Sequence, residues 1–431
     1  MTTEVAVLNK SGIALAADSA VTITSGDNNG KVYNTVNKIF MLSKHHPVGV
    51  MVYGNANVNG IPWETLIKVY RQQLGGKSFP TVREYAEDFL DHLKKSRNLI
   101  DDTHRNLFLV SKVQEVCKSL LDEVANRLNS EQVSGNDIVK RAAKIAEEII
   151  AAAKKGIVSN CDYDRYEILI KRFIQTHSPR FLEVIRATLE EIYDEIDPEA
   201  INELIDGLCY YFYSDFTIGS DSGIVISGFG DNEIFPQITS LRIQGFFDDT
   251  AKYYREDSKT FDKGNSSFDD RVIPFAMDDM IHAFMTGIDP EIQGFLNTRS
   301  TEMLDKLADD IGEALERAEV TDKVAPELIK KMTESTRNNF FRELDEFKAE
   351  NHIAPVTSML RFLPKDELAE MAETLVSLIA FKKKVTSVTE SVGGPIDVAI
   401  ITKGDGFVWI KRKYYFDPKL NQHYLSNYNR D

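Results

Sequence analysis

The apolar positions of this chain alternate as in strands near both ends and recur at helical spacing through most of the middle. Alternation over residues 5–7 and 13–17 predicts two short strands, which the turn residues Lys10-Ser11-Gly12 join into a hairpin. The uncharged run Val48–Gly54 predicts a strand that is buried on both faces. Between these strands, the Gly, Asp and Asn residues of Ser25–Val32 predict a surface loop.

Helical spacing begins directly after the strand at Val48–Gly54. One apolar stripe, which Gly75-Gly76 ends, predicts a first helix with Trp63, Leu66, Ile67, Tyr70 and Leu74 inward. Thr81 and Glu84 have the spacing of a capping box and predict the start of a second helix. From Leu107 to Tyr213 similar stripes predict a block of further helices, and its last aromatic residues are expected to pack against the rest of the protein.

Strand patterns return after this block and again at the end of the chain. Gly223–Phe229 and Ile234–Ile243 predict a hairpin, and the polar segment Asp248–Asp270 predicts a mobile or lid-like loop. Met280–Lys384 is helical by its spacing. Its apolar stripes are expected to be core, including Met303/Leu307/Ile311/Leu315 and Phe340/Phe341/Leu344/Phe347. A final hairpin follows, with strands on either side of Gly404-Asp405-Gly406.

Composition and charge narrow the class of protein. A chain of 431 residues exceeds one typical core, so two lobes or one heavily inserted domain are expected. The net charge of −16 disfavours nucleic acid and anionic membranes as main partners. No signal peptide or membrane-spanning run is evident, and Cys117, Cys161 and Cys209 are scattered, so a reducing cytoplasm is expected. The histidines lack metal-ligand spacing, so no metal or cofactor is expected.

Four residues occur in an order that points to a specific chemistry. Thr2 follows Met1, Asp18 ends the second predicted strand, Lys38 stands in Asn37-Lys38-Ile39-Phe40, and Gly54 ends the uncharged strand. Once Met1 is removed, Thr2 carries a hydroxyl and a free α-amine, whose pKa of about 7.7–8.0 suits a general base. In this order the chain resembles the N-terminal nucleophile (Ntn) hydrolases, and among them the proteasome β-subunits.

The resemblance implies a role for each of these residues. Thr2 matches the nucleophile, Lys38 the catalytic lysine, Asp18 the acid that holds it, and Gly54 the glycine of the oxyanion hole. Lys31 is a rival for the lysine. We prefer Lys38 because Ile39 and Phe40 follow it, as the strand of the family would.

The closing hairpin extends the resemblance but differs from the family around the site. Ser391-Val392-Gly393-Gly394 and the strand after it resemble the end of a proteasome β-subunit. The Asp and Ser that brace the nucleophile in the family align with Thr389 and Val392, and Ser391 lies one residue out of register. A further family serine aligns with Met277, where Asp278 or Asp279 is a candidate substitute.

These observations predict an α+β fold, a four-layer αββα sandwich of the Ntn-hydrolase type with large helical insertions. Its parts are expected at 1–106 (N-terminal core), 107–213 (helical insertion), 214–300 (core hairpin, loop and helix), 301–383 (helical, partly insertion) and 384–431 (C-terminal core strands). Since the insertion falls where ring-forming subunits pack, we expect a monomer or small homo-oligomer; the sequence leaves any regulatory ATPase open.

Two functions remain open at this stage. The first is a threonine peptidase that cleaves peptide or amide bonds through an acyl-enzyme on Thr2. In a variant of this function, a transpeptidase, the acyl group passes to another amine instead of water. The second is a catalytically weakened relative that serves as a binding or scaffold protein, which the changes at Met277, Thr389 and Val392 suggest. We favour the peptidase because Thr2, Asp18 and Lys38 occur together.

Overall fold

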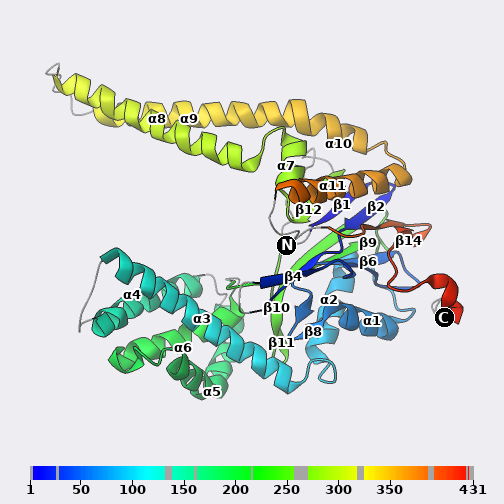
Figure 1. Ribbon diagram of the computed structural model, residues 1–431, viewed down its shortest axis with the longest axis horizontal. Coiled ribbons are helices and arrows are strands. Elements are labelled where there is room, and N and C mark those ends of the chain that lie inside the picture. Colours follow the sequence, from blue (N-terminus) through cyan, green and yellow to red (C-terminus); the bar gives the residue numbers. More distant parts are fainter. Residues whose placement is uncertain are drawn as a thin grey trace.

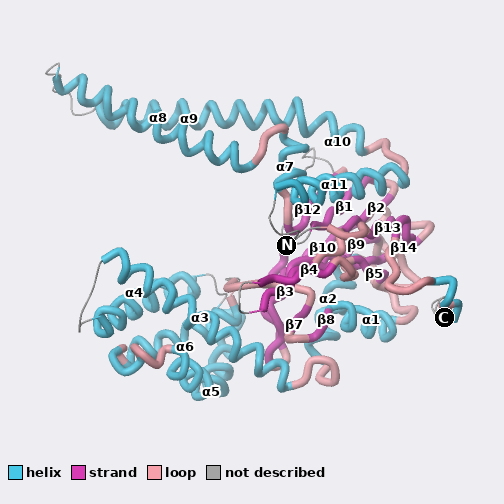
Figure 2. The backbone as a smooth tube through the Cα atoms, in the orientation of Figure 1, coloured by secondary structure: helices cyan, strands magenta, loops and turns pink. Residues whose placement is uncertain are grey.

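The protein combines antiparallel β-sheets with a larger helical part. The computed structural model describes residues 3–25, 29–131, 138–159, 163–214, 217–256, 270–317, 325–386, 393–423 and 426. Two five-stranded sheets form its centre, and helices project from one side of them (Figures 1 and 2). Within the described part of the chain, no helix has the length and apolar character that crossing a membrane requires.

The first sheet brings together both ends of the chain. Its strand order is β12 (Arg271–Ala276), β1 (Thr3–Asn9), β2 (Gly12–Ala17), β13 (Asp397–Thr402) and β14 (Gly406–Lys411). The predicted hairpin is present as β1 and β2, with Asn9 paired to Gly12 across the turn. Strand β13 pairs with β2, so the C-terminal strands lie beside the N-terminal ones.

The second sheet contains the uncharged strand. Its order is β11 (Thr250–Arg255), β10 (Gln237–Phe247), β9 (Ser222–Gly228), β6 (Val48–Gly54) and β5 (Ile39–Met41). As predicted, β6 is buried along almost its whole length. Two short hairpins stand apart from this sheet: β3 (Val21–Ser25) with β4 (Asn29–Tyr33), and β7 (Asn57–Val58) with β8 (Ile61–Pro62).

Strand alternation explains which side chains lie between the sheets. Ala6 and Leu8 of β1 share an apolar cluster with Met51 of β6, whereas Val5 and Val7 face the other way. The outer face of the first sheet packs against α7 (Asp279–Thr286), α10 (Ala354–Leu360) and α11 (Lys365–Thr386). The outer face of the second sheet packs against α1 (Trp63–Leu74) and α2 (Val82–Lys95).

Thr81 is the N-cap residue of α2, at the position where the sequence predicts a capping box. The backbone N–H of Glu84 donates to Oγ1 of Thr81, and the Thr81 hydroxyl donates to the Glu84 carboxylate at 3.1 Å. This cap fixes where the helix begins, and its apolar face then covers the second sheet.

The helical block consists of α3 (Asp102–Glu131), α4 (Ile138–Ser159), α5 (Tyr163–Thr188), a short 3₁₀ turn (Tyr193–Glu195) and α6 (Pro198–Tyr213). It has an apolar core of its own, to which Phe247 of β10 also belongs. Phe212 packs against Phe247 with ring centroids 5.2 Å apart, so the aromatic end of the block meets the second sheet as expected.

A long two-helix arm extends from α7 (Figure 1). It is formed by α8 (Pro290–Arg317) and α9 (Ala325–Lys348), and a π-helical turn (Ala349–Ile353) leads from it into α10. The expectation that its stripes are core is wrong for several residues. Met303 is 68% exposed and Phe347 is 56% exposed. Each helix of the arm packs against the other along one stripe only, so side chains outside that stripe are exposed. The arm also extends beyond the helices that cover the sheets (Figure 1).

Two predicted loops are partly regular structure. The segment predicted as a surface loop at Ser25–Val32 contains β4, which pairs with β3. The polar segment predicted as a loop from Asp248 begins with β11, which pairs with β10 along the edge of the second sheet. Residues 257–269 lie outside the described residues. Both β4 and β11 stand at the edge of a sheet and contain polar residues, so alternation of apolar residues is weak in their sequences.

Candidate active site

Asp18 and Lys38 meet where two strands end. Asp18 directly follows β2, and Lys38 directly precedes β5. The ammonium of Lys38 donates to Oδ1 of Asp18. Asp18 is fully buried and Lys38 is only 4% exposed, so this is an ion pair inside the protein. The backbone holds Lys38 in place because its carbonyl accepts from the Val52 N–H of β6 at 2.8 Å.

A second carboxylate also contacts this lysine. Oε1 of Glu4, on β1, lies 3.2 Å from the Lys38 nitrogen, and the Glu4 side chain is fully buried. Because β1 pairs with β2, Glu4 stands opposite Ala17, next to Asp18. Burial of a charge is unfavourable unless it is paired, so Lys38 compensates two buried carboxylates at once.

Backbone N–H groups fix the Asp18 carboxylate from two ends of the chain. Thr3 N–H donates to Oδ1 at 3.1 Å. Ala20 N–H and Gly393 N–H donate to Oδ2 at 3.2 and 3.1 Å. These three hydrogen bonds fix the orientation of the carboxylate.

Two hydrogen bonds from Ser19 hold the segment Gly393–Pro395 next to Asp18. Ser19 N–H donates to the Gly393 carbonyl at 3.1 Å, and the Ser19 hydroxyl donates to the Pro395 carbonyl. Gly394 has a φ of +79°, and a Cβ there would lie 2.9 Å from Cβ of Asn34. The glycine that the sequence motif contains is therefore required both by backbone conformation and by close packing.

Another buried ion pair stands near the first one. The Lys413 ammonium donates to the Asp397 carboxylate, and the Lys413 N–H donates to Asp397 Oδ1 at 2.8 Å. Burial lowers the pKa of Lys413, and the positive charge of Lys38 acts in the same direction, while the carboxylates of Asp397 and Asp18 oppose it. The two lysines and their carboxylates therefore form one electrostatic cluster.

One cavity, of about 570 Å³, gives access to this cluster, and Lys38 forms part of its wall. Gly54, at the end of β6, lines the same cavity. Its φ is +75°, and a Cβ there would lie 2.6 Å from the Asp221 carbonyl oxygen, so only glycine fits. The remaining wall combines apolar side chains such as Trp63 with the polar side chains of Asn37 and Glu64.

The structure separates Lys31, the rival lysine, from the one that contacts Asp18. Lys31 is exposed on β4, and its ammonium lies 5.1 Å from the centre of the Tyr33 ring. Met277 packs at the edge of the apolar cluster under α7 and α11. Asp278 stands at the N-terminus of α7, two residues after Ala276, which pairs with Thr3. Thr2, Thr389, Ser391 and Val392 lie outside the described residues.

Sequence reasoning missed Glu4 and the pair formed by Asp397 and Lys413. A charged residue directly before the apolar strand positions Val5–Leu8 was an available signal for Glu4. Lys413 follows the last strand of the first sheet, and nothing in its local sequence indicates a partner at Asp397. Among the described residues, no cluster of His, Cys, Asp or Glu is arranged to hold a metal ion.

Comparison with known proteins finds matches among solved structures only. No family model matches the chain, and no curated protein matches it. Among solved structures, the chain is similar to Anbu (ancestral beta-subunit) from Yersinia bercovieri, with 10% sequence identity and a TM-score of 0.25. The match covers 99% of this chain and 94% of that one. A TM-score this low does not establish a shared fold.

Proposed function

We propose that the protein is a threonine-type N-terminal nucleophile hydrolase that cleaves peptide or amide bonds. The observation that carries this proposal is the shared use of one oxygen: Oδ1 of Asp18 accepts from both Lys38 and the backbone N–H of Thr3. Thr2 is bonded to that Thr3 nitrogen. The ion pair therefore contacts the backbone of the residue that directly follows Thr2 in the chain, and Thr2 is proposed to supply the hydroxyl and, after removal of Met1, the free amine.

The proposed reaction has two steps. The Thr2 hydroxyl oxygen attacks the carbonyl carbon of the substrate, and its proton passes to the Thr2 amine, directly or through water. The carbon–nitrogen bond then breaks, the amine returns the proton to the leaving nitrogen, and an ester on Thr2 remains. Water, activated by the same amine, hydrolyses this ester. If another amine attacks instead of water, the same ester gives acyl transfer.

The other proposed site residues would stabilise charge during the reaction and would form no covalent bond with the substrate. The Lys38 ammonium stabilises the negative charge that develops on oxygen, and Asp18 holds this lysine in position. The Gly54 N–H is proposed to stabilise the oxyanion, since Gly54 and Lys38 line the same cavity. Glu64 in that wall favours a substrate side chain that is uncharged or basic.

We further propose that the sheets and their outer helices are the four layers of an αββα sandwich. The apolar cluster between the sheets, with the clusters under α1 and α2 on one side and α11 on the other, supports this arrangement. The scaffold alternative is favoured by Met277, which contributes an apolar side chain where the family has a serine. Activity measurements distinguish the two functions.

The test compares matched variants on a fluorogenic peptide library. We expect Thr2→Ala to abolish turnover and Lys38→Met to reduce kcat by about 10²–10³, the usual effect of losing one group that stabilises an oxyanion. Lys31→Met is the control, because this lysine is exposed on β4. Equal loss in both lysine variants, or turnover by Thr2→Ala, would contradict the mechanism.

A further inference from the structure

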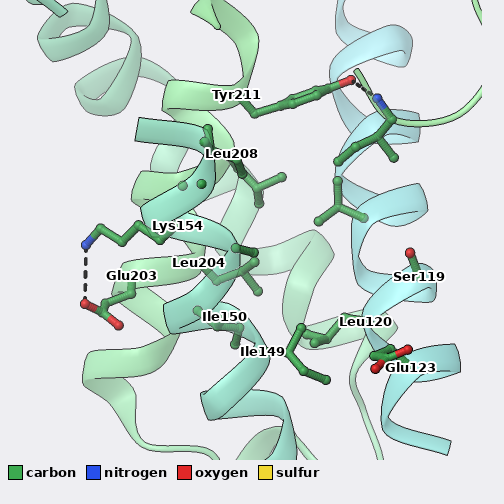
Figure 3. A pocket seen from close by; sticks show the side chains of 16 residues that line it. Ser119, Leu120, Glu123, Ile149, Ile150, Lys154, Glu203, Leu204, Leu208 and Tyr211 are labelled. Carbon is green, nitrogen blue, oxygen red and sulfur yellow. Dashed lines mark hydrogen bonds and ion pairs between the residues drawn. The ribbon is translucent and has the colours of Figure 1, made fainter. Parts of the chain in front are cut away.

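The helical block contains a cavity that the proposed hydrolase chemistry does not use. Its volume is about 410 Å³, within the range of roughly 300–1,000 Å³ typical of small-molecule sites. It lies between α3, α4 and α6, and Figure 3 shows Leu120, Ile149 and Leu204 among the side chains around it. Its wall is mostly apolar, and an apolar molecule that binds there removes this surface from water.

The charged groups in the wall already have partners. Lys154 lies 3.5 Å from Glu203 and 3.7 Å from Asp206, and Glu123 lies 3.0 Å from Arg127. A charged ligand would have to compete with these ion pairs. An uncharged ligand leaves them intact, so the cavity favours molecules without a charge.

One wall of the cavity connects to the candidate active site. Tyr211 and Ile218 line the cavity. The Tyr211 hydroxyl donates to Gln244 at 2.5 Å, and Gln244 donates to the Ile218 carbonyl at 2.7 Å. Three residues further along, the Asp221 carbonyl accepts from the Asn55 N–H at 3.0 Å, directly beside Gly54.

We propose that this cavity binds an uncharged aliphatic molecule and that its occupancy shifts the Ile218–Asp221 segment and, through it, the turn at Gly54. A ligand in the cavity contacts Ile218 and thereby changes the packing at the start of this segment. Ser220 links the same segment to the residue after Gly54, because Asn55 Nδ2 donates to the Ser220 hydroxyl at 2.9 Å. The consequence for catalysis rests on the proposed function, whereas binding does not.

The binding test uses displacement of Nile red by three ten-carbon probes: 1-decanol, decanoate and decyltrimethylammonium. We expect 1-decanol to displace the dye at concentrations about tenfold lower than either charged probe, a difference of about 1.4 kcal/mol. Gly156→Phe should abolish this displacement, because a Cβ at Gly156 meets no atom within 4 Å and the ring can enter the cavity. Gly294→Phe is the control, since Gly294 has the same open surroundings on the distant arm.

The coupling test reads Trp63, which lines the candidate active site, after Trp409→Phe removes the other tryptophan. We expect saturating 1-decanol to shift Trp63 emission, and the shift to be lost with Gly156→Phe but not with Gly294→Phe. Equal decanol binding by both glycine variants would overturn the ligand site, and binding without a Trp63 shift would overturn the coupling. Neither readout needs hydrolase activity, so failure of the proposed function is recognised separately.

Discussion

The Lys38 nitrogen lies 3.2 Å from Oε1 of Glu4 while it also donates to Asp18. One buried cation therefore holds two buried carboxylates that approach it from neighbouring strands. Loss of the cation leaves both carboxylates uncompensated, and loss of either carboxylate leaves the lysine with the other. This arrangement links the stability of the two sheets to the candidate active site.

The first prediction concerns stability. Lys38→Met should lower the free energy of unfolding by about 3–5 kcal/mol, as expected when one partner of a buried ion pair is removed. Lys31→Met, on the exposed strand β4, should change it by no more than about 0.5 kcal/mol. Urea denaturation of both variants measures the difference. Similar small changes in the free energy of unfolding of both variants would show that Lys38 is not part of a buried ion pair.

The second prediction concerns the glycine next to the Asp18 hydrogen bonds. Gly394→Ala places a Cβ 2.9 Å from Asn34 as well as forcing an alanine to a φ of +79°. Gly406→Ala is a matched control, because Gly406 has a φ of +75° but no atom within 4 Å of its Cβ position. The control should cost about 1–2 kcal/mol from backbone strain alone, and Gly394→Ala should cost more. Thermal unfolding compares them, and equal costs would refute the close contact.

The third prediction concerns the thiols and pH. Burial raises the pKa of Cys117 and of Cys209 to about 12, above the ordinary thiol value of 9.0. The unfolded chain loses these thiol protons at a lower pH than the folded protein does. Deprotonation therefore favours the unfolded state, and the free energy of unfolding falls as the pH rises from about 9 toward about 12. At pH 8 both should resist iodoacetamide in the folded protein and react after unfolding. Peptide mapping by mass spectrometry checks this, and rapid labelling of either in the folded protein would contradict it.

The fourth prediction concerns the arm. Met303 is 68% exposed and Leu375 of α11 is 3% exposed. Met303→Ala should therefore change the free energy of unfolding by about 0.5 kcal/mol or less, whereas Leu375→Ala should cost about 2–5 kcal/mol. Denaturation of the two variants at low protein concentration measures both. A large loss for Met303→Ala would show that this face of the arm is covered.

The sequence predicts local features well. The first hairpin follows from alternation and a turn signal, and α2 begins at the capping box because Thr81 and Glu84 contact each other within one helical turn. The contact of Asp18 with Lys38 was anticipated through the family resemblance, because both residues stand at strand ends that the motif places together.

Long-range relations were harder to predict. Periodicity identifies the stripes of α8 and α9 but does not say whether another element covers them, and Met303 is exposed for that reason. The pairing of Asp397 with Lys413 depends on how the chain continues after β14. The role of Glu4 depends on the register of β1 against β2, which only the folded sheet shows.

The most direct test of the central proposal is an intact-mass measurement of the protein from its native host, before and after reaction with a peptide epoxyketone, a reagent for N-terminal threonines. We predict a chain that lacks Met1 and gains one reagent, with the adduct mapped to Thr2, and no adduct with Thr2→Ala. A chain that retains Met1 on most molecules, or an adduct at another residue, would contradict the proposal.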